Sequence, residues 1–445
     1  MPAQCGIGHS FETTIGTLSD NVLLEIFFFY KENDEEDEEG PFFLVWNWHL
    51  LVHICRRWRQ LVYASPRRLD LRILCTRKTP VRKNLDIWPA LPISVDFHNF
   101  YDYWVHADNE DNAITALEHL DRVFEVRLLV TNWELEKIAM AMREPFPVLR
   151  KLHIESEDEN APVLPAKFMG GSAPRLQFIN IVGIPFPTLP TLLLSTSDLN
   201  ILILRELTST GYISPEALVV ALAALPRLKW FTIEFASTRP DHIHPPPPVT
   251  RAVLPALTSF LFKGASEYLE DLVSRIDAPQ LNAIRTYFWI KLVDFQVVQL
   301  SRFIDRSFGS NLTLFKRADV TLDKKVVSFN IYHLTHDRDV PYTTNTISCY
   351  EIDYQVSHMA QVLGHFSAVL SNVVHLDLKI GADESPQLDG LDDIDWLLHQ
   401  FSTVKTLYVI WELAGYVAHA LEDITAEMVT EVLPSLDLIC LHCRP

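Results

Sequence analysis

The sequence predicts an α/β fold in which two short N-terminal helices precede a curved solenoid of parallel strands. A short phrase, Pro-x-Leu followed by alternating apolar residues, recurs along the chain, and helix-like runs separate several of its copies. A helix between successive strands implies right-handed crossovers, which lay the strands parallel. With 48% hydrophobic residues, the chain can bury a sizeable core.

Two amphipathic helices are expected near the N-terminus. The first spans Asp20–Tyr30, with Ser19 or Asp20 as its N-cap. The second runs from about Trp48 to Tyr63 and stops before Pro66, because proline cannot continue a helix. The apolar pattern of the second helix places Cys55 in the core rather than as a nucleophile. Two short helices cannot bury this much apolar surface alone, so part of it should bind a partner or cap the rest of the chain.

These helices carry a family resemblance. The stretches Leu18–Phe27 and Leu50–Pro66, the latter preceded by Trp46, resemble the F-box, particularly that of F-box proteins abundant in mushroom-forming fungi. In those proteins an Arg-Arg-Leu-Asp-Leu strand and a Thr-Pro-Val-Arg segment ending in Leu-Pro-Ile follow, and this chain has both, at 67–71 and 79–93. The match covers Thr17–Val95. Two departures are a serine, Ser19, in place of the family's proline, and an acidic insert at 32–39 with seven carboxylates in eight residues.

The resemblance implies that residues 15–70 are an F-box docking on a Skp-family adaptor of a cullin–RING ubiquitin ligase. By motif position, the candidates for the docking surface and its supporting core are Leu18, Val22, Leu23, Ile26, Leu51, Val52, Cys55 and Trp58. The sequence does not sort the two roles. Residues 71–125 are expected to connect the F-box to the solenoid and to cap its start.

Residues 126–445 are predicted to form degenerate leucine-rich repeats. The marker leucines of the recurring phrase are Leu149, Leu176, Leu199, Leu228, Leu257 and Leu281, of which the copy at 199 lacks the proline. Their steps of 27, 23, 29, 29 and 24 residues match or slightly exceed the leucine-rich-repeat period, although no regular asparagine marks the turn.

Helices and strands can be placed within these repeats. Ser214 as N-cap and Pro215 at the first position open a helix that continues to Leu225. Further helices are expected over Glu267–Ile276, Tyr354–Ser371 and Leu391–Phe401, and strands over Val373–Ile380 and Val404–Trp411. Residues 308–350 break the rhythm, with irregular strands at Leu312–Phe315 and Val326–Tyr332 that belong either to a hairpin insertion or to two worn repeats.

Charge and composition exclude several functions. A net charge of −19 disfavours a phosphate backbone as partner. The longest fully apolar run, Ala217–Leu225, is far shorter than the ~20 residues of a membrane span. The first fourteen residues lack the pattern of a secretory signal, and six cysteines in so long a chain read as reduced thiols. The expected location is therefore the cytoplasm or nucleus.

No motif for catalysis, cofactor or metal binding stands out. Cys440 and Cys443 have a C-x-x-C spacing without a second pair, and His242 and His244 in the proline-rich segment 241–249 are the only complement, so a terminal strand is preferred to a zinc site. The acidic run 389–395 reads as a helix start rather than a calcium loop. The sequence therefore predicts a protein that is not an enzyme, with no cofactor.

The favoured hypothesis is a substrate receptor whose strand face holds a protein for ubiquitination. Trp230, Trp289 and Trp411 are anchor candidates, although packing in the core explains them equally well. One alternative is a scaffold that binds an adaptor without a ubiquitin-ligase role, and another is an enzyme built on an α/β array.

Overall fold

The structure is a computed structural model, and it forms two compact units, one of residues 1–96 and 103–124 and the other of residues 97–102 and 125–445. The residues that it describes are 15–32, 48–77, 81–88, 90–97, 110–237, 251–289, 297–323, 326–333, 344–350, 355–381, 394–422 and 432–442. Most of the acidic insert, the proline-rich segment 241–249, residues 389–393 and Cys443 lie outside these ranges. None of the described helices is long and apolar enough to cross a membrane.

The first unit begins with three helices. They are α1 (Asp20–Glu32), α2 (Trp48–Ile54) and α3 (Arg56–Ala64), and they are followed by β1 (Ile73–Cys75), α4 (Val81–Ile87), β2 (Ile93–Phe97) and α5 (Glu110–Leu117). Strands β1 and β2 pair in parallel. The strand expected at 67–71 is wrong, because residues 66–70 form a turn in which the Leu71 N–H donates to the Pro66 carbonyl and Asp70 adopts a φ of 46°.

The single helix expected from Trp48 to Tyr63 is two helices, which meet at Cys55. Cys55 has extended backbone angles, and its Sγ accepts a hydrogen bond from the Trp58 N–H at 3.5 Å, so it is the N-cap of α3. Its side chain is exposed, which corrects the expectation of a core position. Helix α3 ends before Ser65 and Pro66, as predicted.

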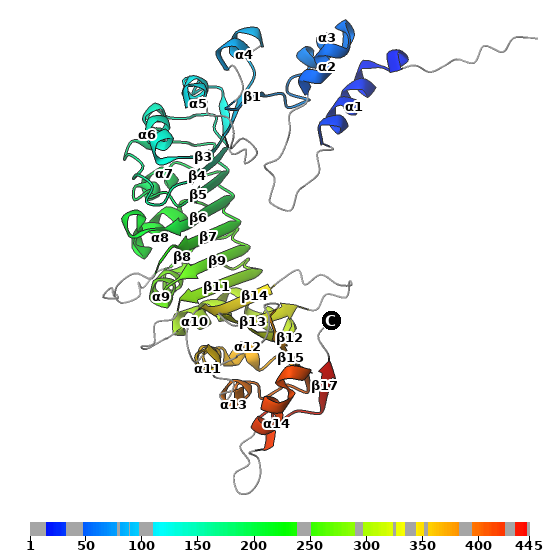
Figure 1. The fold of residues 1–445 in the computed structure, drawn as a ribbon, viewed down its shortest axis with the longest axis vertical. Coiled ribbons are helices and arrows are strands. Elements are labelled where there is room, and N and C mark those ends of the chain that lie inside the picture. The colour runs from blue at the N-terminus through cyan, green and yellow to red at the C-terminus, as the bar shows by residue number, and fades with distance from the viewer. Residues whose placement is uncertain are drawn as a thin grey trace, which may run out of the picture. The chain divides into compact units, whose positions relative to one another are not determined.

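A mostly parallel sheet of 15 strands dominates the fold (Figure 1). From β3 onward its neighbours run in the order β3 (Val123–Val130), β4 (Lys151–Ser156), β5 (Phe178–Val182), β6 (Ile201–Leu207), β7 (Trp230–Phe235), β9 (Ser259–Gly264), β11 (Ala283–Trp289), β14 (Thr344–Tyr350), β13 (Val326–His333), β12 (Phe315–Leu322), β15 (His375–Ile380), β16 (Thr406–Ile410) and β17 (Leu438–His442). Two short strands, β8 (Ala252–Val253) and β10 (Ile276–Asp277), pair with each other.

The described helices of the second unit are α6 (Asn132–Ala141), α7 (Leu189–Leu193), α8 (Pro215–Ala223), α9 (Ser266–Ser274), α10 (Val298–Phe308), α11 (Gln355–Gly364), α12 (Ser367–Leu370), α13 (Ile394–Leu398) and α14 (Ala414–Glu422). Ser214 caps α8 as predicted, since its Oγ accepts a hydrogen bond from the Ala217 N–H at 3.3 Å. The helix expected over 354–371 is split, because residues 365 and 366 form a turn between α11 and α12.

The recurring phrase has a clear structural role. All six marker leucines are buried, with at most 3% of any of them exposed. From the second marker onward, the residue after the marker donates its N–H to the carbonyl of the equivalent residue in the preceding copy of the phrase, at 2.8–2.9 Å. This ladder runs from Arg150, which only accepts, through Gln177, Asn200, Lys229 and Thr258 to Asn282. The phrase therefore fixes a repeated turn, and its marker leucine enters the core.

Residues 308–350 contain a hairpin insertion, one of the two alternatives expected. Strand β13 pairs antiparallel with both β12 and β14, while β14 is parallel to β11 and β12 is parallel to β15. The strand expected at Leu312–Phe315 is mostly wrong, because a 3-10 helix spans Gly309–Leu314 and β12 starts at Phe315.

The sheet has two different faces in its middle portion. Helices α6 to α9 lie on one side of the strands from β3 to β11 (Figure 1). Alternate strand residues, such as Leu202, Phe231 and Phe262, are fully buried. Their neighbours point to the opposite face because side chains alternate along a strand. We call that opposite face of β6, β7, β9 and β11, with its continuation across β14, β13, β12 and β15, the open face.

Candidate protein interface

Helix α1 has two apolar sides, and only one of them is buried. Leu23 and Phe27 are at most 1% exposed, and the Phe27 ring lies 4.6 Å from that of Trp58, centroid to centroid. On another side lie four apolar residues at spacings of four, three and one: Val22 (44% exposed), Ile26 (39%), Phe29 (60%) and Tyr30 (48%). This spacing places them along one helical face, which we call the α1 stripe.

Helix α2 shows the same division. Leu51 and Val52 are buried, whereas Leu50 and Ile54, one turn apart, are 46% and 63% exposed. Exposed apolar side chains that recur at helical spacing are typical of a surface that binds another protein.

Arginines of α3 and of the turn after it hold α1 in place. Arg57 donates to Asp20 Oδ1 at 2.6 Å and to the Leu18 carbonyl at 2.6 Å. Arg68 donates to Glu25 and, at 3.1 Å, to Asn21 Oδ1. Each exposed ion pair contributes little alone, but together these bonds fix the orientation of α1 against α3.

Ser19 preserves the start of α1. Its carbonyl accepts a hydrogen bond from the Leu23 N–H at 3.0 Å, and its Oγ accepts a longer one from the Val22 N–H at 3.4 Å. Serine is a preferred N-cap, so the residue found where the F-box family has proline still begins the helix. The structure thus assigns the cap to Ser19 rather than Asp20.

The structure sorts the eight adaptor-binding candidates by exposure. Val22, Ile26 and Cys55 are exposed, Leu18 and Trp58 are half-buried, and Leu23, Leu51 and Val52 are buried. Phe29, Tyr30, Leu50 and Ile54 extend the exposed set but were not among the candidates. The apolar face of each helix is wider than one packing contact can cover, and this width could have identified them from the sequence.

The open face carries a different surface. Trp230 is 40% exposed, and its indole N–H donates to Thr232 Oγ1 at 3.0 Å. Ile203 and Leu261 are half-buried and lie on either side of Thr232 in the strand register. Trp230 therefore lies on a surface rather than in the core. Trp411 is also exposed, at 66%, and the side chain of Trp289 lies outside the described set.

A charged network occupies the open face where the hairpin insertion meets β15. Asp319 and Asp377 are direct neighbours on β12 and β15, and each is at most 3% exposed. Arg317 donates to Asp377 Oδ2 at 2.6 Å, and Lys379 Nζ lies 3.5 Å from Asp319 Oδ1. Tyr332 donates to Asp319, and burial together with that bond raises the pKa of the Tyr332 hydroxyl. The two carboxylates are thus neutralised by cations that lie nearer to solvent.

In the described part of the chain, the candidate metal ligands are scattered and two of the cysteines are buried. The described residues contain no group of three or more His, Cys, Asp or Glu side chains that could hold a metal ion. Burial raises the pKa of the thiols of Cys75 and Cys349 to about 12, which keeps both protonated and unreactive near neutral pH. Cys440 and His442 lie on the terminal strand β17, as preferred from the sequence.

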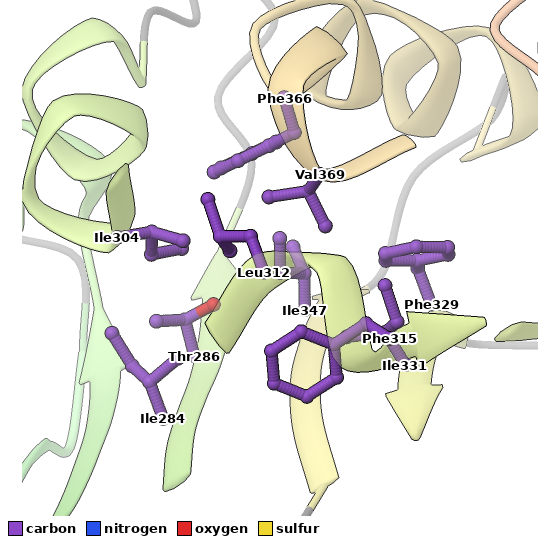
Figure 2. Close-up of a pocket in the computed structure, with 10 residues that line it drawn as sticks. All are labelled: Ile284, Thr286, Ile304, Leu312, Phe315, Phe329, Ile331, Ile347, Phe366 and Val369. Atoms are coloured by element: carbon purple, nitrogen blue, oxygen red, sulfur yellow. The ribbon is translucent and has the colours of Figure 1, made fainter. Parts of the chain in front are cut away.

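Figure 2 shows a small apolar cavity between the sheet and its helices at the hairpin insertion. It has a volume of about 20 Å³ and is lined by Ile284, Thr286, Ile304, Leu312, Phe315, Phe329, Ile331, Ile347, Phe366 and Val369. Thr286 supplies the one polar side chain in this lining, whereas a buried water needs two to four polar partners. The cavity is a packing gap beside the inserted strands rather than a ligand site.

No protein-family model matches this chain, and no curated protein is similar enough to be matched to it.

Proposed function

We propose that this protein is a substrate receptor of a cullin–RING ubiquitin ligase, in which α1, α2 and α3 act as an F-box. The α1 stripe is the observation that carries this proposal, because it exposes four large apolar side chains on a helix whose other side is already packed. Burying one such side chain fully is worth about 1.5–3 kcal/mol, so a partner that covers the stripe gains substantial free energy. The F-box resemblance of this segment makes a Skp-family adaptor the expected partner.

The parallel repeats would then recruit the protein to be ubiquitinated. Their period and buried marker leucines support degenerate leucine-rich repeats, and stacked repeats of this kind form curved solenoids. The receptor itself would perform no chemistry. It would hold the substrate near the ligase and so raise the effective concentration of the substrate's lysines.

The first test is binding of the purified full chain to a purified Skp-family adaptor, measured by calorimetry. The diagnostic variant is Val22→Asp with Ile26→Asp, because both side chains are exposed and their replacement spares the core. Val220→Asp is the matched control, since Val220 is 62% exposed on α8 in the other unit. We expect the double variant to bind at least about 100-fold more weakly than the wild type, in line with the loss of two central apolar contacts. The control should bind like the wild type.

Equal binding by the double variant would show that the α1 stripe is not the docking surface. Failure of the wild-type chain to bind would reject the adaptor as partner. Binding without ubiquitin transfer, once the cullin and RING subunits are added, would favour the alternative of a scaffold without a ligase role.

A further inference from the structure

The open face carries an apolar patch that is three strands wide. Ile201 lies beside Trp230 in the register of β6 and β7, and Ile203 and Leu261 flank Thr232 on the two neighbouring strands. The four apolar side chains of this set are part-exposed, although they belong to strands whose other face is fully packed. Neighbouring strands lie about 4.8 Å apart, so the patch spans about 10 Å, the size of one large side chain.

The Trp230 side chain is exposed, and a hydrogen bond fixes its orientation. The hydrogen bond from its indole N–H to Thr232 Oγ1 satisfies the only polar group of the side chain. Thr232 is 1% exposed, whereas Trp230 is 40% exposed. A fixed aromatic ring loses little conformational entropy on binding, which favours affinity.

The charges that surround this patch are mainly cationic at the surface. Arg285 is exposed on β11, directly beside Leu261 in the register. No described residue forms a hydrogen bond or an ion pair with the Arg285 side chain. Further along the face, the side chains of Arg317 and Lys379 are 45% and 43% exposed, whereas the carboxylates paired with them are at most 4% exposed.

This distribution is unusual for a chain with a net charge of −19. The carboxylates of the network lie beneath their cations, so a partner approaching the open face there meets positive charge. Charges of opposite sign attract across an interface and charges of the same sign repel, so this surface favours acidic partners. Arg205 of β6 is also exposed, and its Nε lies 3.4 Å from Glu234 Oε1.

We propose that the open face binds an extended acidic segment of a partner protein. An aromatic or aliphatic side chain of the segment packs on Trp230, Ile203 and Leu261, and its carboxylates pair with Arg285 and then with Arg317 and Lys379. The path from β7 to β15 crosses six strand spacings, or about 29 Å, which an extended peptide covers with about nine residues. The role of this segment as a ubiquitination signal rests on the function proposed above, whereas its binding does not.

The test is selection of a random 12-residue peptide library on the immobilised full chain, in the absence of any adaptor. We expect the recovered peptides to be rich in Asp and Glu around one aromatic or aliphatic residue. Calorimetry of the best peptide should show about 10-fold weaker binding to Arg285→Glu and about 30-fold weaker binding to Trp230→Ala. Higher salt should also weaken binding, because exposed charges are screened.

Arg227→Glu is the matched control for charge. Arg227 is 68% exposed in the turn before β7, off the open face, and its substitution should leave peptide affinity unchanged. Recovery of basic or neutral peptides, recovery of none, or equal affinities for Arg285→Glu and Arg227→Glu would overturn the proposal. Thermal unfolding of Arg285→Glu verifies that the variant is folded, since this exposed side chain makes no described contact that the fold needs.

The two proposals fail separately in these experiments. Peptide capture without adaptor binding would leave the open face as a binding site and reject the ligase role. Adaptor binding without peptide capture would keep the proposed F-box function and reject the open face as a peptide-binding site.

Discussion

Glu270 caps a helix to which it does not belong, and its replacement should measurably weaken the second unit. Helix α10 starts after Val297, whose side chain makes no capping bond. Glu270 of α9 supplies the missing acceptors instead, since its two carboxylate oxygens accept the N–H groups of Gln299 and Leu300 at 2.7 Å each. These are the second and third residues of α10, the donors that an N-cap side chain normally satisfies.

The expected magnitude follows from these two bonds. Loss of an N-cap costs about 0.5–2 kcal/mol, and two short charge-assisted bonds place Glu270→Ala at the upper end, so we expect a loss of about 2 kcal/mol in the free energy of unfolding. Glu270→Gln keeps one acceptor oxygen and also removes the buried charge, so it should lose less stability than Glu270→Ala at pH 7. Urea unfolding followed by circular dichroism measures both. Glu267→Gln is the matched control, because Glu267 is exposed on the same helix.

The same carboxyl group gives a pH dependence with a defined sign. Burial raises the pKa of Glu270 above its ordinary value of 4.5, against the opposing effect of the two N–H bonds and of Arg302. The folded state therefore binds a proton at a higher pH than the unfolded state does. As the pH falls through the raised folded pKa towards 4.5, the wild type should gain stability relative to Glu270→Gln.

Loss of wild-type stability relative to Glu270→Gln as the pH falls would refute this reasoning. It would mean that the two N–H bonds and the helix dipole outweigh burial and hold the pKa below 4.5. A loss of less than about 0.5 kcal/mol in Glu270→Ala would show that water satisfies the α10 donors equally well.

Three further predictions concern stability, each measured by thermal or urea unfolding. Gly170→Ala should lower the free energy of unfolding by about 2–3 kcal/mol, because φ is +58° and the new Cβ would lie 2.6 Å from a Pro145 side-chain atom. Gly171→Ala has a φ of +69° but open space around the new Cβ, so it should cost only about 1 kcal/mol. Equal losses in the two variants would contradict the steric argument. Val369→Ile should stabilise the chain by about 0.5–1 kcal/mol by filling the cavity of Figure 2, and destabilisation would show that the gap cannot take a methyl group. Cys55→Ser should keep α3 as stable as in the wild type, while Cys55→Ala should lose about 1 kcal/mol, and a tolerated alanine would refute the capping role of the thiol.

The regular part of the fold could be predicted from local signals. The marker leucines and the proline turns set the period, and a serine followed by proline set the start of α8. The errors fall where one local signal competes with another. Helical periodicity runs straight through Cys55, but the thiol accepts the Trp58 N–H and starts a new helix there. Likewise, Leu312 and Leu314 alternate like a strand, yet they lie in a 3-10 turn that feeds β12.

The candidate surfaces could be predicted only in part, and for a physical reason. Periodicity shows that Val22, Leu23 and Ile26 are apolar on a helix, but which of them is buried depends on where Trp58 and the arginines of α3 lie. On the open face, alternation places Trp230 opposite Phe231, and both are aromatic, so the sequence cannot tell which one faces the helices. The order of the inserted strands is harder still, since it brings Asp319 beside Asp377 across 58 residues of chain. Two carboxylates so placed would repel each other without the cations of Arg317 and Lys379. The fold itself therefore requires these two cations on the open face, whether or not a partner binds them.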